Sequence, residues 1–319
     1  MLTPAPKPIM GWMREPALAV PADAAPQWLG GKALVGLIGS GIGLSLTPAM
    51  HEEEAAQQGL RLHYQLIDLD RSGCGVEALP VLLQAARIMG YAGLNITYPC
   101  KQAVMPLLDD LSEEARAMGA VNTVVVQGGR LIGHNTDGSG WAWGFRRALP
   151  GADLGCVVLL GTGGAGSAIA HAALRMGTQR LRLFDREAQR AEQLAAELNV
   201  IYGAERVQAR TDIAAAMDSA TGLIHATPTG MAKLPGLPLP AELLHSGLWV
   251  SEVVYFPLQT ALLQAARARG CAVVDGGGMA VGQAVGAFRL FTGRPADAAR
   301  MQTHFTRLLQ AREVCEPQV

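Results

Sequence analysis

The sequence predicts an α/β fold in two domains, and three observations indicate it. The chain has 319 residues, which suits two domains of ordinary size. Half of the residues are hydrophobic and 38 are glycines, whereas only 5% are aromatic, a composition typical of a well-buried chain with frequent turns. From residue 155 onward, apolar runs of strand length alternate with helical patterns, as in a parallel sheet covered on both faces.

The first part of the chain predicts short strands, helices and one hairpin. Residues 1–30 are rich in proline and alanine and are expected to form an N-terminal extension. Thr47 has N-cap chemistry, and Pro48 suits the first helical position after it. A glycine pair at 128–129 favours a hairpin turn. We expect strands at 33–38, 62–69, 92–97, 120–126 and 131–137, helices at 49–58, 76–88, 99–108 and 113–118, and a further helix that contains Trp141.

The second part of the chain alternates strictly between strand and helix. The turns between them are short and marked by glycine, which is typical of parallel strands with crossover helices. Two helices, at 279–292 and 296–311, are expected to end the chain. We expect strands at 157–160, 180–184, 222–226, 248–254 and 272–274, and helices at 167–176, 188–198 and 258–269.

The charge balance and the thiols exclude several function classes. Lys and Arg number 26, Asp and Glu 27, and this net charge of -1 provides no basic field for nucleic acid or an anionic membrane. We see neither a signal peptide nor an apolar run long enough to span a membrane. The five cysteines are scattered, which indicates reduced thiols in a cytoplasmic protein. No His/Cys/Asp/Glu cluster has metal-ligand spacing, so we expect no metal.

Residues 161–166 have the glycine pattern of a dinucleotide-binding turn. Gly161, Gly163 and Gly166 form G-x-G-x-x-G directly after an apolar strand and at the start of a helix. The first glycine permits the tight turn, the second lets backbone N–H groups approach a pyrophosphate, and the third lets the helix pack on its strand. A plain strand-to-helix turn is the alternative. With this motif, the predicted parallel sheet is of the Rossmann type, doubly wound.

Asp185 strengthens the dinucleotide prediction and points to NAD. It ends the next predicted strand, where an acidic residue accepts from the adenosine ribose 2′-hydroxyl and repels a 2′-phosphate. Arg186, the following residue, is a complication because a guanidinium in this turn favours NADP. A helix N-cap is the structural alternative for Asp185. We expect NAD, with NADP as the alternative.

Polar residues gather where two strands of the first part end. Asn95 and Thr97 share one face of a strand end, and Lys101 follows in the first turn of a helix begun by Pro99. The helix dipole disfavours a positive charge there, a cost that makes sense for a proton-transfer lysine. Asp137 lies in a second strand-to-helix connection. A surface lysine and a helix cap are the plain alternatives for Lys101 and Asp137.

These segments together resemble the shikimate/quinate dehydrogenase family. The match runs in order from about Leu34 to Gly293. The motifs that carry it are Ser45-Leu-Thr47-Pro48-x-Met50-His51, Asn95-Ile-Thr97-x-Pro99-x-Lys101, Gly119-Ala-Val-Asn122-Thr123, Gly133-x-Asn135-Thr136-Asp137-Gly138, Gly161-x-Gly163-Gly164-Ala165, Ala226-Thr-Pro-Thr-Gly230-Met231, Val254-Tyr255-x-Pro257-x-x-Thr260 and Gly278-Met279-x-x-x-Gln283.

The resemblance implies a role for each matching position. Lys101 and Asp137 are similar to the catalytic pair that flanks the substrate hydroxyl. The implied substrate-binding residues are Ser45, Thr47 and Tyr255 for the carboxylate, and Asn95, Thr97, Asn122 and Gln283 for the ring hydroxyls. The implied cofactor-binding residues are Gly161, Gly163, Gly164, Ala165, Gly166, Asp185, Arg186, Thr227, Met231, Gly278 and Met279.

The resemblance also implies the domain organisation and the reaction. Residues 31–133 and 279–319 would form an α/β substrate-binding domain completed by the C-terminal helices, and residues 134–278 the dinucleotide-binding domain. The enzyme would reversibly oxidise shikimate to 3-dehydroshikimate, quinate to 3-dehydroquinate, or both. Hydride would pass to NAD and the hydroxyl proton to Lys101. Its partners would be small molecules, and the chain would be a monomer or a homodimer.

Two departures from the family's biosynthetic members point to the NAD-using quinate/shikimate branch. The biosynthetic members typically carry Ser-x-Ser where this chain has Ser45-Leu-Thr47, and Asn-Arg-Thr where this chain has Phe184-Asp185-Arg186. Gly282 is expected to leave room beside the substrate. The alternatives are an NADP-dependent biosynthetic enzyme, an aminoshikimate dehydrogenase, a related folate dehydrogenase or tRNA-linked reductase, and a non-catalytic NAD-binding sensor. Cys100, beside Lys101, is expected to be a filler residue but open to alkylation.

Overall fold

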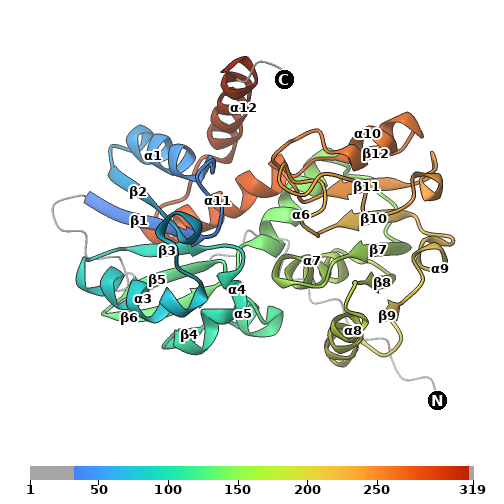
Figure 1. Cartoon of the computed structure of the whole chain (residues 1–319), viewed down its shortest axis with the longest axis horizontal. Helices are drawn as coiled ribbons and strands as arrows, with labels where there is room; N and C mark the ends of the chain where they lie inside the picture. Colours follow the sequence, from blue (N-terminus) through green and yellow to red (C-terminus); the bar gives the residue numbers. More distant parts are fainter. Residues whose placement is uncertain (1–31, 316–319) are drawn as a thin grey trace.

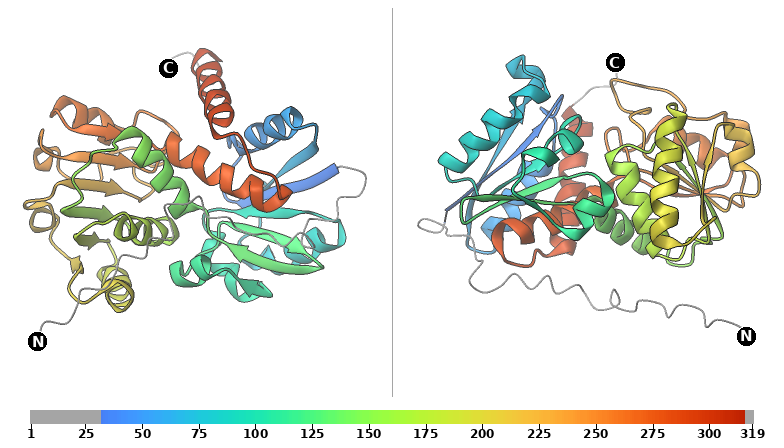
Figure 2. Two further views of the ribbon diagram at one scale, coloured as in Figure 1. Left: turned by 180° about the vertical axis from the view of Figure 1, so that it is seen from behind. Right: turned by 90° about the horizontal axis from the view of Figure 1, so that it is seen from below.

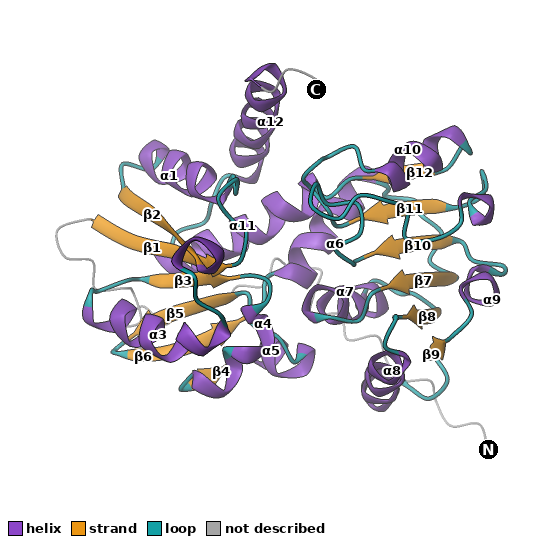
Figure 3. Cartoon of the chain, viewed as in Figure 1, coloured by secondary structure: helices purple, strands orange, loops and turns teal. Residues whose placement is uncertain are grey.

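Two six-stranded sheets lie side by side, joined by two helices (Figure 1). The computed structural model describes residues 32–315, so the predicted extension 1–30 lies outside the described residues. The strand orders are β2-β1-β3-β5-β6-β4 and β12-β11-β10-β7-β8-β9. Helices cover both sheets (Figure 3), which confirms the predicted α/β fold.

The first sheet is mixed. β1 pairs in parallel with β2 and β3, whereas β5 runs antiparallel to β3 and β6. Gly128 and Gly129 have φ values of 55° and 76°, which confirms the predicted hairpin turn between β5 and β6. The strands are β1 (Lys32–Gly39), β2 (Arg61–Asp68), β3 (Gly93–Ile96), β4 (Asp110–Leu111), β5 (Thr123–Gln127) and β6 (Arg130–His134).

Helices cover this sheet, and three details of them differ from the expectation. The predicted N-cap at Thr47 was wrong, because Leu46 caps α1 and Thr47 is its first residue. The expected helix 99–108 breaks into two short turns because Pro106 has no N–H to continue it. The expected helix 76–88 opens with a 3₁₀ turn. The helices are α1 (Thr47–Gln57), α2 (Leu69–Ser72), α3 (Leu79–Ile88), α4 (Cys100–Ala103) and α5 (Glu113–Met118), with η4 (Val76–Ala78) and η5 (Met105–Leu107).

All six strands of the second sheet are parallel. Numbered by chain position within this sheet, their order is 3-2-1-4-5-6, the order of dinucleotide-binding folds, with the ligand crevice at the ends of β7 and β10. The edge strand β9 was not predicted, because it has four residues of which two are Gln208 and Arg210. The strands are β7 (Cys156–Leu160), β8 (Arg180–Phe184), β9 (Val207–Arg210), β10 (Gly222–His225), β11 (Trp249–Glu252) and β12 (Ala272–Val274).

Alternate residues of the central strand β7 enter two different cores. Val157 and Leu159 pack in a cluster with residues of α7 and α8, whereas Val158 and Leu160 pack with residues of α9 and α10. This alternation explains why the strand reads as an unbroken apolar run. The helices are α7 (Gly164–Arg175), α8 (Ala188–Tyr202), α9 (Ile213–Met217) and α10 (Ala261–Ala268), with η6 (Ala241–Leu243).

Two helices carry the chain between the sheets (Figure 2). α6 (Asp137–Ala148) leaves the first sheet, and α11 (Gly277–Thr292) returns before α12 (Ala298–Cys315). They pack closely because a Cβ on Gly140 would lie 2.4 Å from the Gln283 nitrogen, and one on Gly282 would lie 2.6 Å from the Gly140 oxygen. Gly282 therefore permits helix contact rather than leaving room for a substrate, which corrects the expectation. The domain boundaries at 133/134 and 278/279 stay predictions.

The last helix is fastened to the first unit by an ion pair. Arg300 of α12 donates from Nε to Oε2 of Glu54 at 2.7 Å and from Nη2 to Oε1 at 2.6 Å. The Glu54 side chain is fully buried. Burial alone would raise the pKa of Glu54, but its hydrogen bonds to Arg300, the Asp297 backbone and Gln58 hold the pKa below its ordinary value. α12 is thereby held against α1.

Candidate active site

An ion pair between Lys101 and Asp137 forms the centre of the candidate site. Nζ of Lys101 lies 2.5 Å from Oδ2 of Asp137. Lys101 is on α4, shortly after β3, and Asp137 is the first residue of α6, shortly after β6. The Asp137 side chain is 5% exposed and that of Lys101 19%, so the lysine keeps an opening to the surface while its carboxylate partner is buried. Charge-assisted hydrogen bonds of this kind orient both groups.

The helix that carries Lys101 is shorter than expected. α4 has four residues, and Pro99 is its N-cap rather than its first residue. One helical turn has only a small dipole, so the expected dipole effect on Lys101 is minor. Asp137 is the group that sets the electrostatic surroundings of this lysine.

A chain of buried side chains holds Asp137. Tyr64 donates to Oδ1 of Asn95 at 2.6 Å, and Asn95 donates to Oγ1 of Thr123 at 3.0 Å. Thr123 donates to Oδ1 of Asn122 at 2.9 Å, and Asn122 donates to Oδ1 of Asp137 at 2.9 Å. Every donor points toward the carboxylate, an arrangement in which hydrogen bonds strengthen one another. The chain fixes the Asp137 rotamer and leaves Oδ2 for Lys101.

Asn95 and Asn122 were expected to contact substrate hydroxyls, and the structure shows their amides engaged with the protein. Asn122 donates to Asp137 and Thr136, and its Oδ1 accepts from Thr123 and from the Thr136 backbone. Asn95 donates to Thr123 and to the Asn122 carbonyl. Their exposed fractions are 4% and 3%. The geometry therefore gives both residues a positioning role, and their contact with a substrate stays a prediction.

Tyr64, Thr123 and Thr136 are members of this network that sequence reasoning missed. Tyr64 lies in the middle of β2, whose predicted alternation places it on the inward face. A phenol on a buried face must find a partner, and this requirement was the available signal. Thr123 directly follows Asn122 and donates to its Oδ1, whereas Thr136 lies 14 residues after Asn122 and also bonds to it, a contact that only the tertiary structure shows.

Residues expected to hold a carboxylate meet at the start of α1. Oγ of Ser45 accepts from the backbone N–H of Thr47 at 3.3 Å. Tyr255, in the loop after β11 of the second unit, hydrogen-bonds the Ser45 hydroxyl. Burial raises the pKa of the Tyr255 phenol, and the Ser45 bond and the charge of Arg312 offset part of that rise. A protonated phenol bridges the two units at this point.

Thr97 and Gln283 lie on two further segments of the site. Thr97 directly follows β3. A Cβ on Gly39 would lie 2.3 Å from the Thr97 methyl group, so a side chain at position 39 would displace Thr97. The Gln283 carbonyl accepts from the Thr136 hydroxyl at 3.1 Å, which places this part of α11 beside the start of α6. The Gln283 amide donates to the Ala280 carbonyl at 3.0 Å. Both side chains are partly buried.

The glycine turn after β7 has the geometry that its spacing predicts. Gly161 has a φ of 92°, and a Cβ on it would lie 2.8 Å from the Ala226 oxygen. A Cβ on Gly166 would lie 2.0 Å from the Gly161 oxygen, whereas one on Gly163 would meet nothing within 4 Å. The turn is thus tight against its own strands and open in front of Gly163, the N-cap of α7. This opening suits an anionic diphosphate.

The same turn touches the candidate catalytic lysine. A Cβ on Gly164 would lie 3.4 Å from the Cβ of Lys101. Ala165, the next residue, is partly buried in the first turn of α7, and Ser167 donates to the Met118 carbonyl of α5 at 2.8 Å. The glycine turn and the Lys101/Asp137 pair therefore lie next to each other.

Asp185 connects the end of β8 with the glycine turn. Its Oδ2 accepts from the backbone and hydroxyl of Thr162 at 2.8 and 2.9 Å, and its Oδ1 accepts from the Glu187 backbone at 3.0 Å. Burial alone would raise the pKa of Asp185, but the hydrogen bonds from Glu187 and Thr162 lower it below its ordinary value. The carboxylate is therefore ionised. Arg186 beside it is exposed.

Thr227 rests on a buried polar group that was not predicted. Nδ1 of His225 is 2.9 Å from Oε1 of Glu252. Nε2 of the same ring is 2.5 Å from Oγ1 of Thr227. Thr260 donates to the other Glu252 oxygen at 3.0 Å. The His225 and Glu252 side chains have no exposed surface. This group fixes the Thr227 hydroxyl at the end of β10, at the switch point of the sheet.

The remaining residues expected at the nicotinamide side differ in exposure. Met231 is 43% exposed, whereas Met279 is buried in a cluster with Trp141 and Phe145. Gly278 packs on α6, where its Cβ would lie 3.0 Å from the Gly144 Cα.

Cys100 is not open to alkylation, contrary to the expectation. Its side chain is fully buried, and burial raises the pKa of the thiol to about 11. Within residues 32–315, no group of three or more His, Cys, Asp or Glu side chains is placed to hold a metal ion. The helices in this range also include none with the length and apolarity needed to cross a bilayer.

Comparison with known proteins connects this geometry to one family. The family model described as "Shikimate dehydrogenase substrate binding domain" matches residues 37–124, and the one described as "Shikimate 5'-dehydrogenase C-terminal domain" matches residues 276–303. A shikimate dehydrogenase (NADP(+)) of Streptomyces avermitilis is 59% identical over 84% of this chain and 93% of its own. A quinate/shikimate dehydrogenase (NAD(+)) of Corynebacterium glutamicum is 48% identical over 86% of this chain and 98% of its own.

A solved structure agrees with both relatives. The quinate dehydrogenase from Corynebacterium glutamicum in complex with NAD superposes with a TM-score of 0.80 at 46% identity, covering 86% of this chain and 99% of that one. Similarity of this extent, over nearly the whole length of each relative, confirms the resemblance found in the sequence motifs. The chain belongs to the shikimate dehydrogenase family.

Proposed function

We propose that this enzyme reversibly oxidises shikimate to 3-dehydroshikimate, quinate to 3-dehydroquinate, or both, with NAD as the electron acceptor. The observation that carries the proposal is the Lys101/Asp137 pair, 2.5 Å apart, which lies next to the glycine turn. A proton acceptor beside a dinucleotide site is what oxidation of a secondary alcohol requires.

The residues present fit a nicotinamide dinucleotide. The open space in front of Gly163 and the N-terminus of α7 suit the diphosphate, and Asp185 lies where the adenosine ribose is expected. Thr227, Met231, Gly278 and Met279 are proposed for the nicotinamide side, with Gly164, Ala165 and Gly166 backing the turn. When bound, the dinucleotide supplies the two-electron acceptor.

Lys101 and Asp137 are proposed to move the proton. Nζ of Lys101 takes the hydroxyl proton as the carbinol carbon is oxidised, and returns it in the reverse direction. Asp137 orients Nζ and offsets its charge once it is protonated. General acid–base help of this kind contributes about 10²–10⁴ in rate. The buried chain from Tyr64 to Asp137 keeps the carboxylate in position for each turnover.

The substrate is proposed to lie between Lys101 and the Ser45/Tyr255 contact. Ser45, Thr47 and Tyr255 supply hydroxyl groups for the carboxylate at the start of α1. Thr97, directly after β3, and Gln283 of α11 approach the ring, and Asn95 and Asn122 line the buried side. Four free cysteines among the described residues are consistent with a reducing, cytoplasmic setting.

The cofactor preference rests on Asp185. An ionised carboxylate accepts from a ribose 2′-hydroxyl and repels a 2′-phosphate. The relative named for NAD at 48% identity and the NAD-bound quinate dehydrogenase support this choice. The second candidate is an NADP-dependent shikimate dehydrogenase, because a relative of 59% identity is named for NADP and Arg186 is exposed beside Asp185.

The test is a spectrophotometric assay that crosses shikimate and quinate with NAD and NADP. We expect the absorbance of the reduced nicotinamide to rise with NAD and at least one of the acids. The ratio of the rates with shikimate and quinate identifies the preferred substrate. Turnover only with shikimate and NADP would select the second candidate. Absence of turnover in all four combinations would overturn the proposed reaction.

A further inference from the structure

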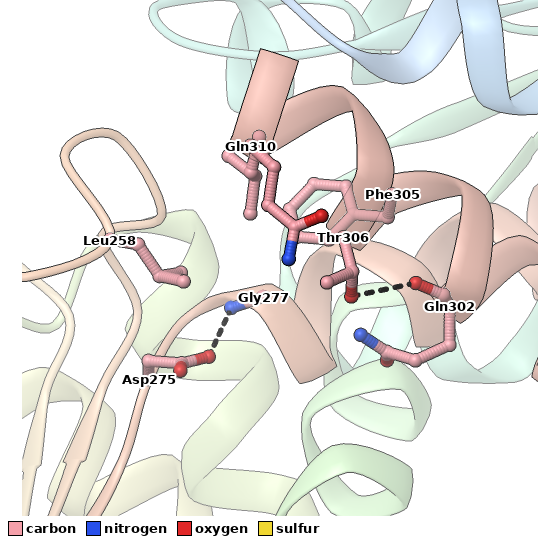
Figure 4. A pocket seen from close by; sticks show the side chains of 8 residues that line it. Leu258, Asp275, Gly277, Gln302, Phe305, Thr306 and Gln310 are labelled. Carbon is pink, nitrogen blue, oxygen red and sulfur yellow. Dashed lines mark hydrogen bonds between the residues drawn. The ribbon is translucent and has the colours of Figure 1, made fainter. Parts of the chain in front are cut away.

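The C-terminal helix brings one arginine to the junction between the two units. Arg312 follows Leu309 by three residues, so both lie on the same face of α12. Leu309 lines a pocket of about 260 Å³ whose opposite wall includes Leu258 of the second unit (Figure 4). The Arg312 guanidinium lies 5.8 Å from the ring centroid of Phe256, in the same loop as Leu258. This face of α12 is therefore turned toward the loop that carries Tyr255.

Arg312 also reaches the segment directly before Ser45. Its Nη1 donates to the Leu44 carbonyl at 2.5 Å, directly before Ser45. Tyr255, directly before Phe256, hydrogen-bonds the Ser45 hydroxyl. Burial raises the pKa of its phenol, and the Ser45 bond and the positive charge of Arg312 offset part of that rise. The guanidinium thus stands beside the Ser45/Tyr255 contact, where three segments distant in the sequence meet.

The charge of Arg312 has no carboxylate partner in the described part of the chain. Arg300, on the same helix, pairs with Glu54 and Asp297, but no ion pair involves Arg312 among residues whose side chains the structure describes. A guanidinium has five N–H donors, and Leu44 takes one of them. The remaining donors can pair with an anion that binds beside the Ser45/Tyr255 contact.

We propose that Arg312 is a binding residue for the carboxylate of the substrate, which it recognises together with Ser45 and Tyr255. The inference rests on the proposed function, because both proposed substrates are carboxylic acids. Arg312 supplies the positive charge that Ser45, Thr47 and Tyr255 lack. It distinguishes an anionic substrate from a neutral one with the same ring, whereas the hydroxyl groups accept either.

The test compares shikimate with its uncharged methyl ester in wild type and in Arg312→Gln. We expect the variant to lower kcat/KM for the acid about tenfold, mainly through KM, because one charge-assisted hydrogen bond is lost. The ester should change less than twofold, and the KM for NAD should stay the same. Arg312→Lys should restore part of the discrimination between acid and ester. Quinate and its ester replace this pair if quinate is the faster substrate.

Arg307→Gln is the matched control, since Arg307 lies on the exposed face of the same helix and pairs with His304. It should leave acid and ester kinetics unchanged. Equal losses on acid and ester in Arg312→Gln would show a structural role and overturn the proposal. A wild type that oxidises neither acid would overturn the proposed function itself, and the two failures are therefore distinguishable.

Discussion

The orientation and the electrostatic surroundings of Lys101 depend more on Asp137 than on the short helix α4. The residue types and their spacing predicted a proton-transfer lysine, and the structure supplies a buried carboxylate 2.5 Å from its Nζ. The partner is itself fixed by Asn122, whose amide has no free donor. A geometry held by several hydrogen bonds costs little reorganisation when the proton moves.

Lys101→Met should abolish most turnover. The variant keeps the length of the side chain but cannot accept a proton, so kcat should fall by about 10²–10⁴. NAD affinity, measured by fluorescence titration, should stay nearly unchanged, because the contact with Gly164 involves only the Cβ and stem of the side chain. An equal loss of turnover and NAD affinity would contradict the assigned role.

Asp185→Ala should weaken NAD far more than NADP. The carboxylate is the proposed acceptor for the ribose hydroxyl, and its loss should raise the KM for NAD about tenfold. Asp185→Asn keeps an acceptor for Thr162 while removing the charge, so it separates repulsion of the 2′-phosphate from the support of the glycine turn. Steady-state kinetics with NAD and with NADP measures both KM values. An unchanged preference between the two dinucleotides would contradict the proposed contact of Asp185 with the ribose.

Among the helices, the close glycine contact between α6 and α11 positions Asp137 and Gln283 relative to each other. α6 carries Asp137 at its start, and α11 carries Gln283 beside Gly282. The backbones approach so closely at Gly140 and Gly282 that no side chain fits between them. A shift of either helix would therefore move a residue of the site.

Gly282→Ala should lower both stability and activity. Its Cβ would lie 2.6 Å from a backbone oxygen, a contact that forces α6 and α11 apart at a cost of about 1–3 kcal/mol. Urea unfolding should show the loss in the free energy of unfolding, and kcat should fall with it. Gly151→Ala is the control, because a Cβ there meets nothing within 4 Å. Similar behaviour of the two variants would contradict the packing argument.

At the scale of the whole molecule, two buried histidines make stability depend on pH. Burial lowers the pKa of His51 to about 4 and, together with the nearby Arg175, that of His171 to about 4, against an ordinary value of 6.5. The unfolded chain therefore binds protons that the folded chain excludes. The contribution of these two histidines to stability is complete above about pH 6.5 and is lost as the pH drops toward 4.

The free energy of unfolding should fall by about 2 kcal/mol for each of these histidines between pH 7.5 and 5. Urea titrations at the two pH values measure it. His171→Asn should reduce the difference between them by one histidine's share. The exposed His63 provides the control, and His63→Gln should behave as wild type. A His171→Asn protein with the wild-type pH dependence would contradict the assignment.

The fold class and the glycine turn could be predicted from the amino-acid sequence, which also predicted the Lys101/Asp137 pair that the structure brings together. Local chemistry explains this: apolar periodicity, Gly161 with its positive φ, and polar residues at strand ends all act within a few residues. The tertiary structure alone decided the edge strand β9, the hydrogen-bond chain from Tyr64 and the place of Arg312. These three features depend on contacts between residues far apart in the sequence, and a local sequence pattern cannot predict such contacts. The packing role of Gly282 depends in the same way on Gly140, which lies on another helix.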